Sequence, residues 1–166
     1  MEVLDAIFER FSCRSFRADP VSSELLMKLV DAGRIAPTSM GRQPWEFVVI
    51  TDVSTLRELS KQIENGRFLA QAAACIAVLC RSDVRAAVED GSAATENILL
   101  AATGLGLGSC WIAGNGKPYQ KDVERLLRAP DGLKLISLVA LGYPGAKMPV
   151  DRRRRPLQEV LHWQRF

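Results

Sequence analysis

Short aliphatic runs alternate with segments of helical periodicity, and this alternation constrains the fold more than any other feature of the chain. Residues 46–51, 75–80 and 135–141 are runs of aliphatic and β-branched residues suited to buried strands. Apolar residues recur at helical spacing over 2–10 and 22–35, and Ser22 or Ser23 can cap the second of these helices. The pattern predicts a sheet covered by helices.

The remaining segments extend this pattern. Leu56 and Leu59 fall three apart in a helical segment between the first two strands. Residues 91–103 are apolar around most of the helical circumference, so we expect this helix to be deeply buried, in the core or against a second subunit. A strand through 110–112 and a short helix near 118–128 complete the expected elements.

Length and composition set outer limits on the class of protein. With 166 residues, 48% apolar and 25% charged, the chain fits one globular domain over 1–166 that needs no disulfide or structural metal. No apolar stretch approaches the roughly 20 residues of a membrane helix, and the start of the chain lacks the pattern of a signal peptide. We therefore expect a cytoplasmic protein that does not bind a membrane.

The cysteines and the single histidine argue against a metal centre. The four cysteines include no C-x-x-C pair, and we expect Cys75 and Cys110 to be buried and unpaired within apolar runs. His162 is the one imidazole in the sequence, so a His-rich zinc site cannot be assembled. No metal is expected.

A block of four arginines, 152–155, lies between Pro149 and Pro156 near the end of the chain. Such a block can be a solvated tail or a weak nucleic-acid patch. The flanking prolines favour extended backbone, and 146–166 has no core pattern of its own. We therefore expect an extended C-terminal strap that can carry alternate arginines to one phosphate.

Common catalytic motifs are missing. Gly104-x-Gly106-x-Gly108 follows a helix and precedes a strand, which is the reverse of a dinucleotide-binding fingerprint and favours a helix C-terminal turn. The sequence contains no nucleophile elbow, H-E-x-x-H helix or phosphate-binding P-loop. If the chain is an enzyme, these absences favour a bound cofactor as the carrier of reactivity.

Four motifs follow one another in a specific order along the chain. They are Arg10-x-Ser12-x-Arg14-x-Phe16, Ala36-Pro37-Thr38-Ser39 with Gln43-Pro44-Trp45, Gly106-Leu107-Gly108-x-Cys110-Trp111-Ile112, and Gly142-Tyr143-Pro144 followed by Arg154-Arg155-Pro156-Leu157. Together they resemble the nitroreductase-like flavoprotein family. The resemblance covers most of the chain and implies a bound flavin mononucleotide (FMN).

The resemblance implies that arginines from both ends of the chain hold the FMN. Arg10, Ser12 and Arg14 would approach its phosphate, ribityl chain and pyrimidine edge, and Arg152 and Arg154 would add charge at the phosphate. Guanidinium groups suit this role because their donors meet phosphate oxygens bidentately. Without the resemblance, Arg10 is more simply a solvent-exposed cation near a helix C-terminus.

The resemblance also implies that a partner subunit completes each site. Pro37, Thr38 and Ser39 would reach the same flavin from that partner. Two departures from the family pattern stand out: Gly41 replaces a frequent Asn, which removes an amide contact, and Phe11 replaces a basic or polar residue, which leaves only a backbone contact.

The predicted flavin-lining strand would supply the rest of the pocket. Its lining residues are Trp111, Ile112, Ala113 and Gly114, with a backbone N–H near Ala113 facing flavin N5. We assign no side chain a catalytic role, because the flavin carries the chemistry. Read without the resemblance, Trp111 is equally well a core aromatic on a strand.

The implied fold is α+β, a mainly antiparallel central sheet flanked by helices, with the C-terminal segment exchanged across a homodimer. The implied function is an FMN-dependent oxidoreductase that transfers hydride from NADH or NADPH to a small acceptor such as a nitroaromatic or quinone. Three alternatives stay open: a flavin-binding or regulatory dimer, a specialised flavin enzyme (dehalogenase, azoline oxidase or flavin-fragmenting), and an arginine-strap nucleic-acid binder. The expected partners are a second copy and a small-molecule acceptor, without nucleic acid.

Overall fold

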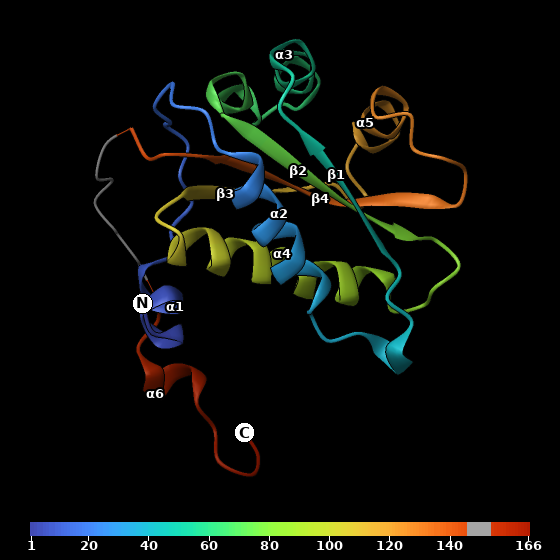
Figure 1. Ribbon diagram of the computed structural model, residues 1–166. Helices are drawn as coiled ribbons and strands as arrows, with labels where there is room; N and C mark the ends of the chain where they lie inside the picture. The colour runs from blue at the N-terminus through green and yellow to red at the C-terminus, as the bar shows by residue number, and fades with distance from the viewer. Residues whose placement is uncertain (146–153) are drawn as a thin grey trace.

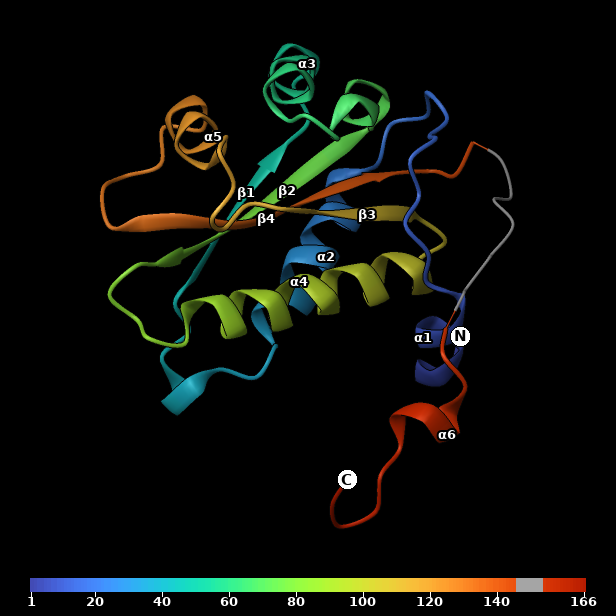
Figure 2. The ribbon, with the colours of Figure 1, turned by 180° about the vertical axis from the view of Figure 1, so that it is seen from behind.

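The protein is represented by a computed structural model, and the structure describes residues 1–145 and 154–166. In these residues, four antiparallel strands form one sheet in the order β1-β2-β4-β3, with helices on both faces (Figures 1 and 2). The expected α+β architecture with an antiparallel sheet is confirmed. The elements, in chain order, are α1 (Val3–Glu9), α2 (Ser23–Arg34), η1 (Ser39–Gly41), β1 (Trp45–Ile50), α3 (Val53–Gln62), η2 (Arg67–Gln71), β2 (Ala74–Arg81), α4 (Ala87–Gly104), β3 (Gly108–Ala113), α5 (Gln120–Leu126), β4 (Leu133–Gly142) and α6 (Leu157–Val160).

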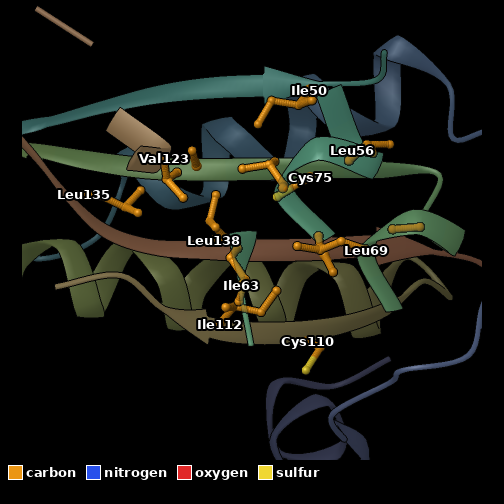
Figure 3. Close-up of a cluster of buried hydrophobic side chains, with 14 of the residues drawn as sticks. Ile50, Leu56, Ile63, Leu69, Cys75, Cys110, Ile112, Val123, Leu135 and Leu138 are labelled. Carbon is orange, nitrogen blue, oxygen red and sulfur yellow. The ribbon is translucent and has the colours of Figure 1, made fainter. Parts of the chain in front are cut away.

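Helices cover both faces of the sheet. Helices α2 and α4 lie against one face, and α3, α5 and η2 lie against the other (Figures 1 and 2). Between the sheet and α3 and α5 is an apolar layer that includes Leu56, Ile63 and Leu138 (Figure 3). Because both faces are covered, the central strand β2 is buried along all but its last residue, which explains its continuous apolar sequence.

The boundaries of α2 follow the sequence signals closely. The Ser22 hydroxyl accepts a 3.3 Å hydrogen bond from the Leu25 N–H, so Ser22 rather than Ser23 is the cap. The helix ends at Arg34, three residues before Pro37. Both features agree with the expected helix over 22–35.

Helix α4 begins earlier than expected. It starts at Ala87 rather than at residue 91, with Glu89 and Asp90 in its first turn, where negative charge suits the helix dipole. Gly91 lets the helix lie directly on the sheet, since a Cβ there would stand 2.8 Å from Ile136. Gly106, with φ of +75°, forms the turn after the helix, which confirms the interpretation of the glycine-rich segment.

The cysteines behave as predicted. Cys75 and Cys110 are buried and free, as are the other two cysteines. Among the described residues, no cluster of His, Cys, Asp or Glu side chains could hold a metal ion. In the same part of the chain, no helix combines the length and the apolar character that crossing a bilayer requires.

The C-terminal segment departs from the expected strap over part of its length. Residues 157–160 form the short helix α6, which begins directly after Pro156. Proline suits this place because its fixed φ is compatible with a helix start. Both α6 and the C-terminus project away from the sheet, on the side where α1 lies (Figures 1 and 2).

Candidate functional site

A cavity of about 600 Å³ lies beside the edge strand β3, a size typical of cofactor sites. Four of the residues predicted from the sequence line it: Arg14, Trp111, Ile112 and Ala113. The rest of the wall comes mainly from the segment joining α3 to η2 and from the segment joining β3 to α5. The cavity therefore collects residues from four separate parts of the chain.

The segment that carries Arg14 runs along β3. Ser12 forms a parallel bridge with Ser109, and the Cys13 N–H donates a 2.9 Å hydrogen bond to the Ser109 carbonyl. This pairing holds the exposed Arg14 side chain at the mouth of the cavity, where its guanidinium lies 5.9 Å from the Phe68 ring centroid. The sheet edge thus fixes the backbone beneath this arginine.

Arg10, Phe11 and Ser12 do not line the cavity itself. The Arg10 guanidinium forms an ion pair with Glu96 on α4, with Nε 3.6 Å from the carboxylate oxygen. Phe11 packs partly buried against the apolar layer under α3 and α5. Ser12 is exposed next to β3. These three residues lie on the same segment as Arg14 but outside the cavity wall.

The side chain of Tyr119 holds the end of β3 in place. The Tyr119 hydroxyl donates a 2.5 Å hydrogen bond to the Ala113 carbonyl, and both residues line the cavity. Burial raises the pKa of Tyr119 above its ordinary value near 10, so the hydroxyl keeps its proton at neutral pH. Gly114 follows, and a Cβ there would lie 2.5 Å from the Leu135 Cγ, so the close approach that this glycine permits is to β4.

A buried carboxylate holds the segment between β3 and α5. Glu124 Oε1 accepts 2.8 Å hydrogen bonds from the Leu135 N–H and from the Gln120 amide, and the Gln120 carbonyl oxygen accepts from the Gly116 N–H. This series of hydrogen bonds ties residues 114–120 to strand β4 of the sheet. The carboxylate also accepts from Lys121. Burial alone raises the pKa of Glu124, but these hydrogen bonds outweigh it and hold that pKa below its usual range.

The predicted Pro37-Thr38-Ser39 loop is not brought to this cavity within one chain. Asp90, in the first turn of α4, holds the loop through hydrogen bonds of 2.8 Å from the Thr38 hydroxyl and 3.0 Å from the Ser39 N–H. Helix α1 lies toward the opposite end of α4 (Figures 1 and 2). Gly41 has φ of +66° and open space around its missing Cβ.

The structure describes one of the two tail arginines. Arg154 is exposed, in a segment that passes close to α1 before α6 begins (Figures 1 and 2). Arg152 lies outside the described residues. The meeting of head and tail arginines at one phosphate therefore stays a prediction.

The cavity offers no reactive thiol. Burial raises the pKa of Cys110, and the nearby positive charge of Arg14 offsets this only in part. The group stays a neutral thiol near pH 7, whereas nucleophilic cysteines have a lowered pKa. The cavity thus combines a cation, backbone and aromatic surface with no activated nucleophile, which suits a bound cofactor.

Comparison with known proteins decides the family. The sequence profile of the Nitroreductase family matches residues 7–74 and 62–143. The chain belongs to the nitroreductase family. An Archaeoglobus fulgidus protein described as a candidate NADH dehydrogenase/NAD(P)H nitroreductase is 37% identical to this nitroreductase-family chain over 149 residues, 86% of each sequence.

Solved structures of the nitroreductase family share the fold. An FMN-dependent nitroreductase from Clostridium difficile superposes with a TM-score of 0.92 at 28% identity, covering 98% of this chain and 99% of its own. The NADPH:FMN oxidoreductase from Vibrio harveyi, solved in complex with NAD+, gives a TM-score of 0.88 at 26% identity, covering 99% of this chain and 77% of its own.

Several lining residues were not singled out from the sequence. Gln62 ends α3, Asn65 and Phe68 lie in or just before η2, and Lys117 and Tyr119 precede α5. Their spacing carries no motif. One signal was present in the sequence: Gln62 follows Leu59 by three residues, so a polar side chain continues the stripe of Leu56 and Leu59, but this indicates a site only once β3 lies beside it.

Proposed function

We propose that this chain is an FMN-dependent oxidoreductase that transfers hydride from NADH or NADPH to a small acceptor such as a nitroaromatic or a quinone. One domain over 1–166 would hold the FMN, which when bound accepts and donates hydride at N5. The observation that carries the proposal is the cavity beside β3, where Arg14 stands near Trp111–Ala113. The names of the family relatives support the choice of FMN and of a nicotinamide reductant.

The residues of the cavity fit this cofactor. Gln62 Oε1 is buried at the cavity wall and has no hydrogen-bond partner among the described residues. An unpaired buried acceptor is costly unless a ligand supplies a donor, and the pyrimidine edge of a flavin carries an N–H. The Arg14 guanidinium can serve the carbonyl oxygens of the same edge, so the polar groups present complement that edge.

Each predicted residue then has a role in holding the cofactor. Arg14 would place positive charge near the pyrimidine edge, where it raises the electron affinity of the ring. Arg10 and Ser12, with Arg152 and Arg154 from the tail, would bind the phosphate and the ribityl chain. Trp111 and Ile112 exclude water beside the ring. Tyr119 holds the carbonyl of Ala113, the residue whose backbone N–H we expect to face N5.

The proposed site is shared by two copies of the chain. In one chain the Pro37-Thr38-Ser39 loop is held by the first turn of α4, while α1 lies toward the other end of that helix (Figure 2). Leu4 and Phe8 on α1 are 64% and 68% exposed, and Trp163 near the C-terminus is 75% exposed. Apolar side chains this exposed favour a partner surface. We propose a homodimer in which the C-terminal segment crosses to the partner and each loop reaches the partner's flavin.

The test is the absorption spectrum of the purified full-length protein. A flavin spectrum that bleaches anaerobically with NADH or NADPH, and recovers when a quinone or nitroaromatic is added, is the expected result. A flavin that neither nucleotide bleaches would reject the reductant assignment and leave a flavin-binding or regulatory dimer. Bleaching without recovery by this panel would instead favour a specialised enzyme of the same fold. A colourless protein that retains DNA or RNA in a salt-sensitive way would favour the nucleic-acid alternative.

A further inference from the structure

A buried carboxylate outside the cavity holds the Thr38–Ser39 segment, and its effect on the cofactor goes beyond the function proposed above. Asp90 is 4% exposed, although charged side chains are rarely buried unless they are paired. Its Oδ2 accepts a 2.8 Å hydrogen bond from the Thr38 hydroxyl, and its Oδ1 accepts a 3.0 Å hydrogen bond from the Ser39 N–H. Both partners lie about 50 residues earlier in the chain. The carboxylate therefore joins α4 to the loop ahead of β1.

The loop that Asp90 holds has a costly backbone conformation. Met40 and Gln43 adopt φ of 54° and 44°, in the left-handed region that disfavours residues other than glycine. Met40 is 85% exposed, so its side chain gains little from packing. Such residues persist where the surroundings determine the conformation strongly. The two hydrogen bonds to Asp90 supply that constraint directly before Met40.

These hydrogen bonds also decide which groups of the loop remain for a ligand. The Thr38 hydroxyl donates its proton to Asp90 and accepts from the Gln43 N–H at 2.9 Å, so it has no second proton to donate. The Ser39 N–H is equally committed. The Ser39 hydroxyl, on an exposed residue, has no hydrogen-bond partner in the described part of the chain. Of the two hydroxyls, that of Ser39 is therefore the one that can donate a hydrogen bond to a ligand.

We propose that Asp90 is a positioning residue that sets the Thr38–Ser39 turn, so that the Ser39 hydroxyl and not that of Thr38 meets the FMN of the partner subunit. This inference rests on the proposed function, because it needs a flavin between two protomers. Asp90 does not touch the cofactor and acts through the loop. It changes the roles expected from the sequence, where both side chains were assigned to the flavin.

The experiment compares three variants of the full-length protein. Asp90→Ala removes both hydrogen bonds. Asp90→Asn keeps a carbonyl oxygen for the Ser39 N–H and an amide that can donate to the Thr38 oxygen. Thr95→Val is the matched control, because Thr95 is a buried residue of the same helix whose hydroxyl is hydrogen-bonded at 2.7 Å to that of Ser137, away from the loop.

Two readouts are measured on each variant. The first is the FMN dissociation constant of the stripped protein, from flavin fluorescence. The second is the rate of tryptic cleavage after Arg42, which is exposed in the same loop and needs no flavin to be followed. Thermal unfolding is recorded so that a general loss of stability can be separated from a local one.

We expect Asp90→Ala to weaken FMN binding by about tenfold to a hundredfold, the loss typical of hydrogen bonds to a charged group, and to speed cleavage after Arg42. Asp90→Asn should recover most of both properties. Thr95→Val should lower the unfolding temperature yet keep the FMN dissociation constant and the cleavage rate within about twofold of wild type, because additivity holds for sites without shared partners.

The inference is overturned if Asp90→Ala binds FMN as tightly as wild type, or if FMN affinity simply follows unfolding temperature across all three variants. A wild-type protein that binds no FMN would overturn the proposed function instead. The cleavage rate then still decides the structural part, because an unchanged rate in Asp90→Ala shows that Asp90 does not hold the loop.

Discussion

The Tyr119 hydroxyl donates a 2.5 Å hydrogen bond to the carbonyl of Ala113, the last residue of β3. This bond holds Ala113, the residue whose backbone N–H we expect to face flavin N5. Tyr119→Phe should lower the free energy of unfolding by about 1 kcal/mol, the net value of one hydrogen bond, and slow anaerobic flavin reduction several-fold. Stopped-flow bleaching with NADH or NADPH measures the rate. An unchanged rate would show that the Ala113 peptide needs no such support.

Replacing Gln62 should affect the stability of the protein and its affinity for FMN in opposite directions. Gln62→Leu removes a buried acceptor without a described partner, so the protein without flavin should unfold at the same temperature or higher. The same change should weaken FMN binding by about tenfold, because the pyrimidine edge loses an acceptor. Thermal unfolding and flavin fluorescence titration measure the two effects. Gln71→Leu, on an exposed residue of η2, is the control. A destabilised Gln62→Leu with normal FMN affinity would contradict the assignment.

Gly41 marks a place where this chain departs from the family pattern. Its φ of +66° is accessible to asparagine, and no atom lies within 4 Å of the position that a Cβ would occupy, so Gly41→Asn should fold normally. If the amide contact implied by the family resemblance is missing here, the variant should bind FMN several-fold more tightly. Gly41→Val is the contrasting variant and should be destabilised by about 1–2 kcal/mol at this φ. If neither variant binds FMN more tightly than wild type, Gly41 does not belong to the site.

The stability contributed by Glu124 should depend on pH in a defined direction. The folded-state pKa of this carboxyl is held below its usual value of 4.5, so its contribution is complete above that pH and fades as the pH falls through the lower folded-state value. Glu124→Gln should therefore cost about 1–2 kcal/mol at pH 7 and progressively less in acid. Urea unfolding at several pH values measures this. Glu9→Gln, on an exposed residue, is the control, and a cost that grows in acid would contradict the assignment.

The fold was largely predictable because local sequence patterns indicate most of its strands and helices. The aliphatic run of β2 and the nearly all-apolar α4 follow from burial on both sides, and Ser22 caps α2 by local chemistry alone. The early start of α4 and the short helix α6 were missed. Residues 87–90 make a single helical turn with polar residues at 89 and 90, so they show no apolar stripe. The four residues of 157–160 are too few for helical periodicity to be recognised.

The candidate site was predictable only where a motif carries it. Arg14 and Trp111–Ala113, which the family resemblance assigns to the flavin, line one cavity, and their contact with the flavin stays a prediction. Gln62 and Tyr119 were missed because tertiary contacts alone bring them beside β3. The role of Asp90 was equally hidden, since a single acid in the first turn of a helix is normally a dipole effect and its loop partners lie far away in the sequence.

The central claim is that each FMN site is built from residues of both protomers, and subunit complementation tests it most directly. Arg10→Ala/Arg14→Ala removes the head contacts, and Ser39→Trp blocks the loop contact, so neither parent dimer should hold FMN. A mixed dimer, isolated through two different tags, should regain about one FMN per dimer, because isologous symmetry leaves one site with both halves intact. Full FMN binding by the Ser39→Trp dimer, or mixed dimers as empty as their parents, would contradict a shared site.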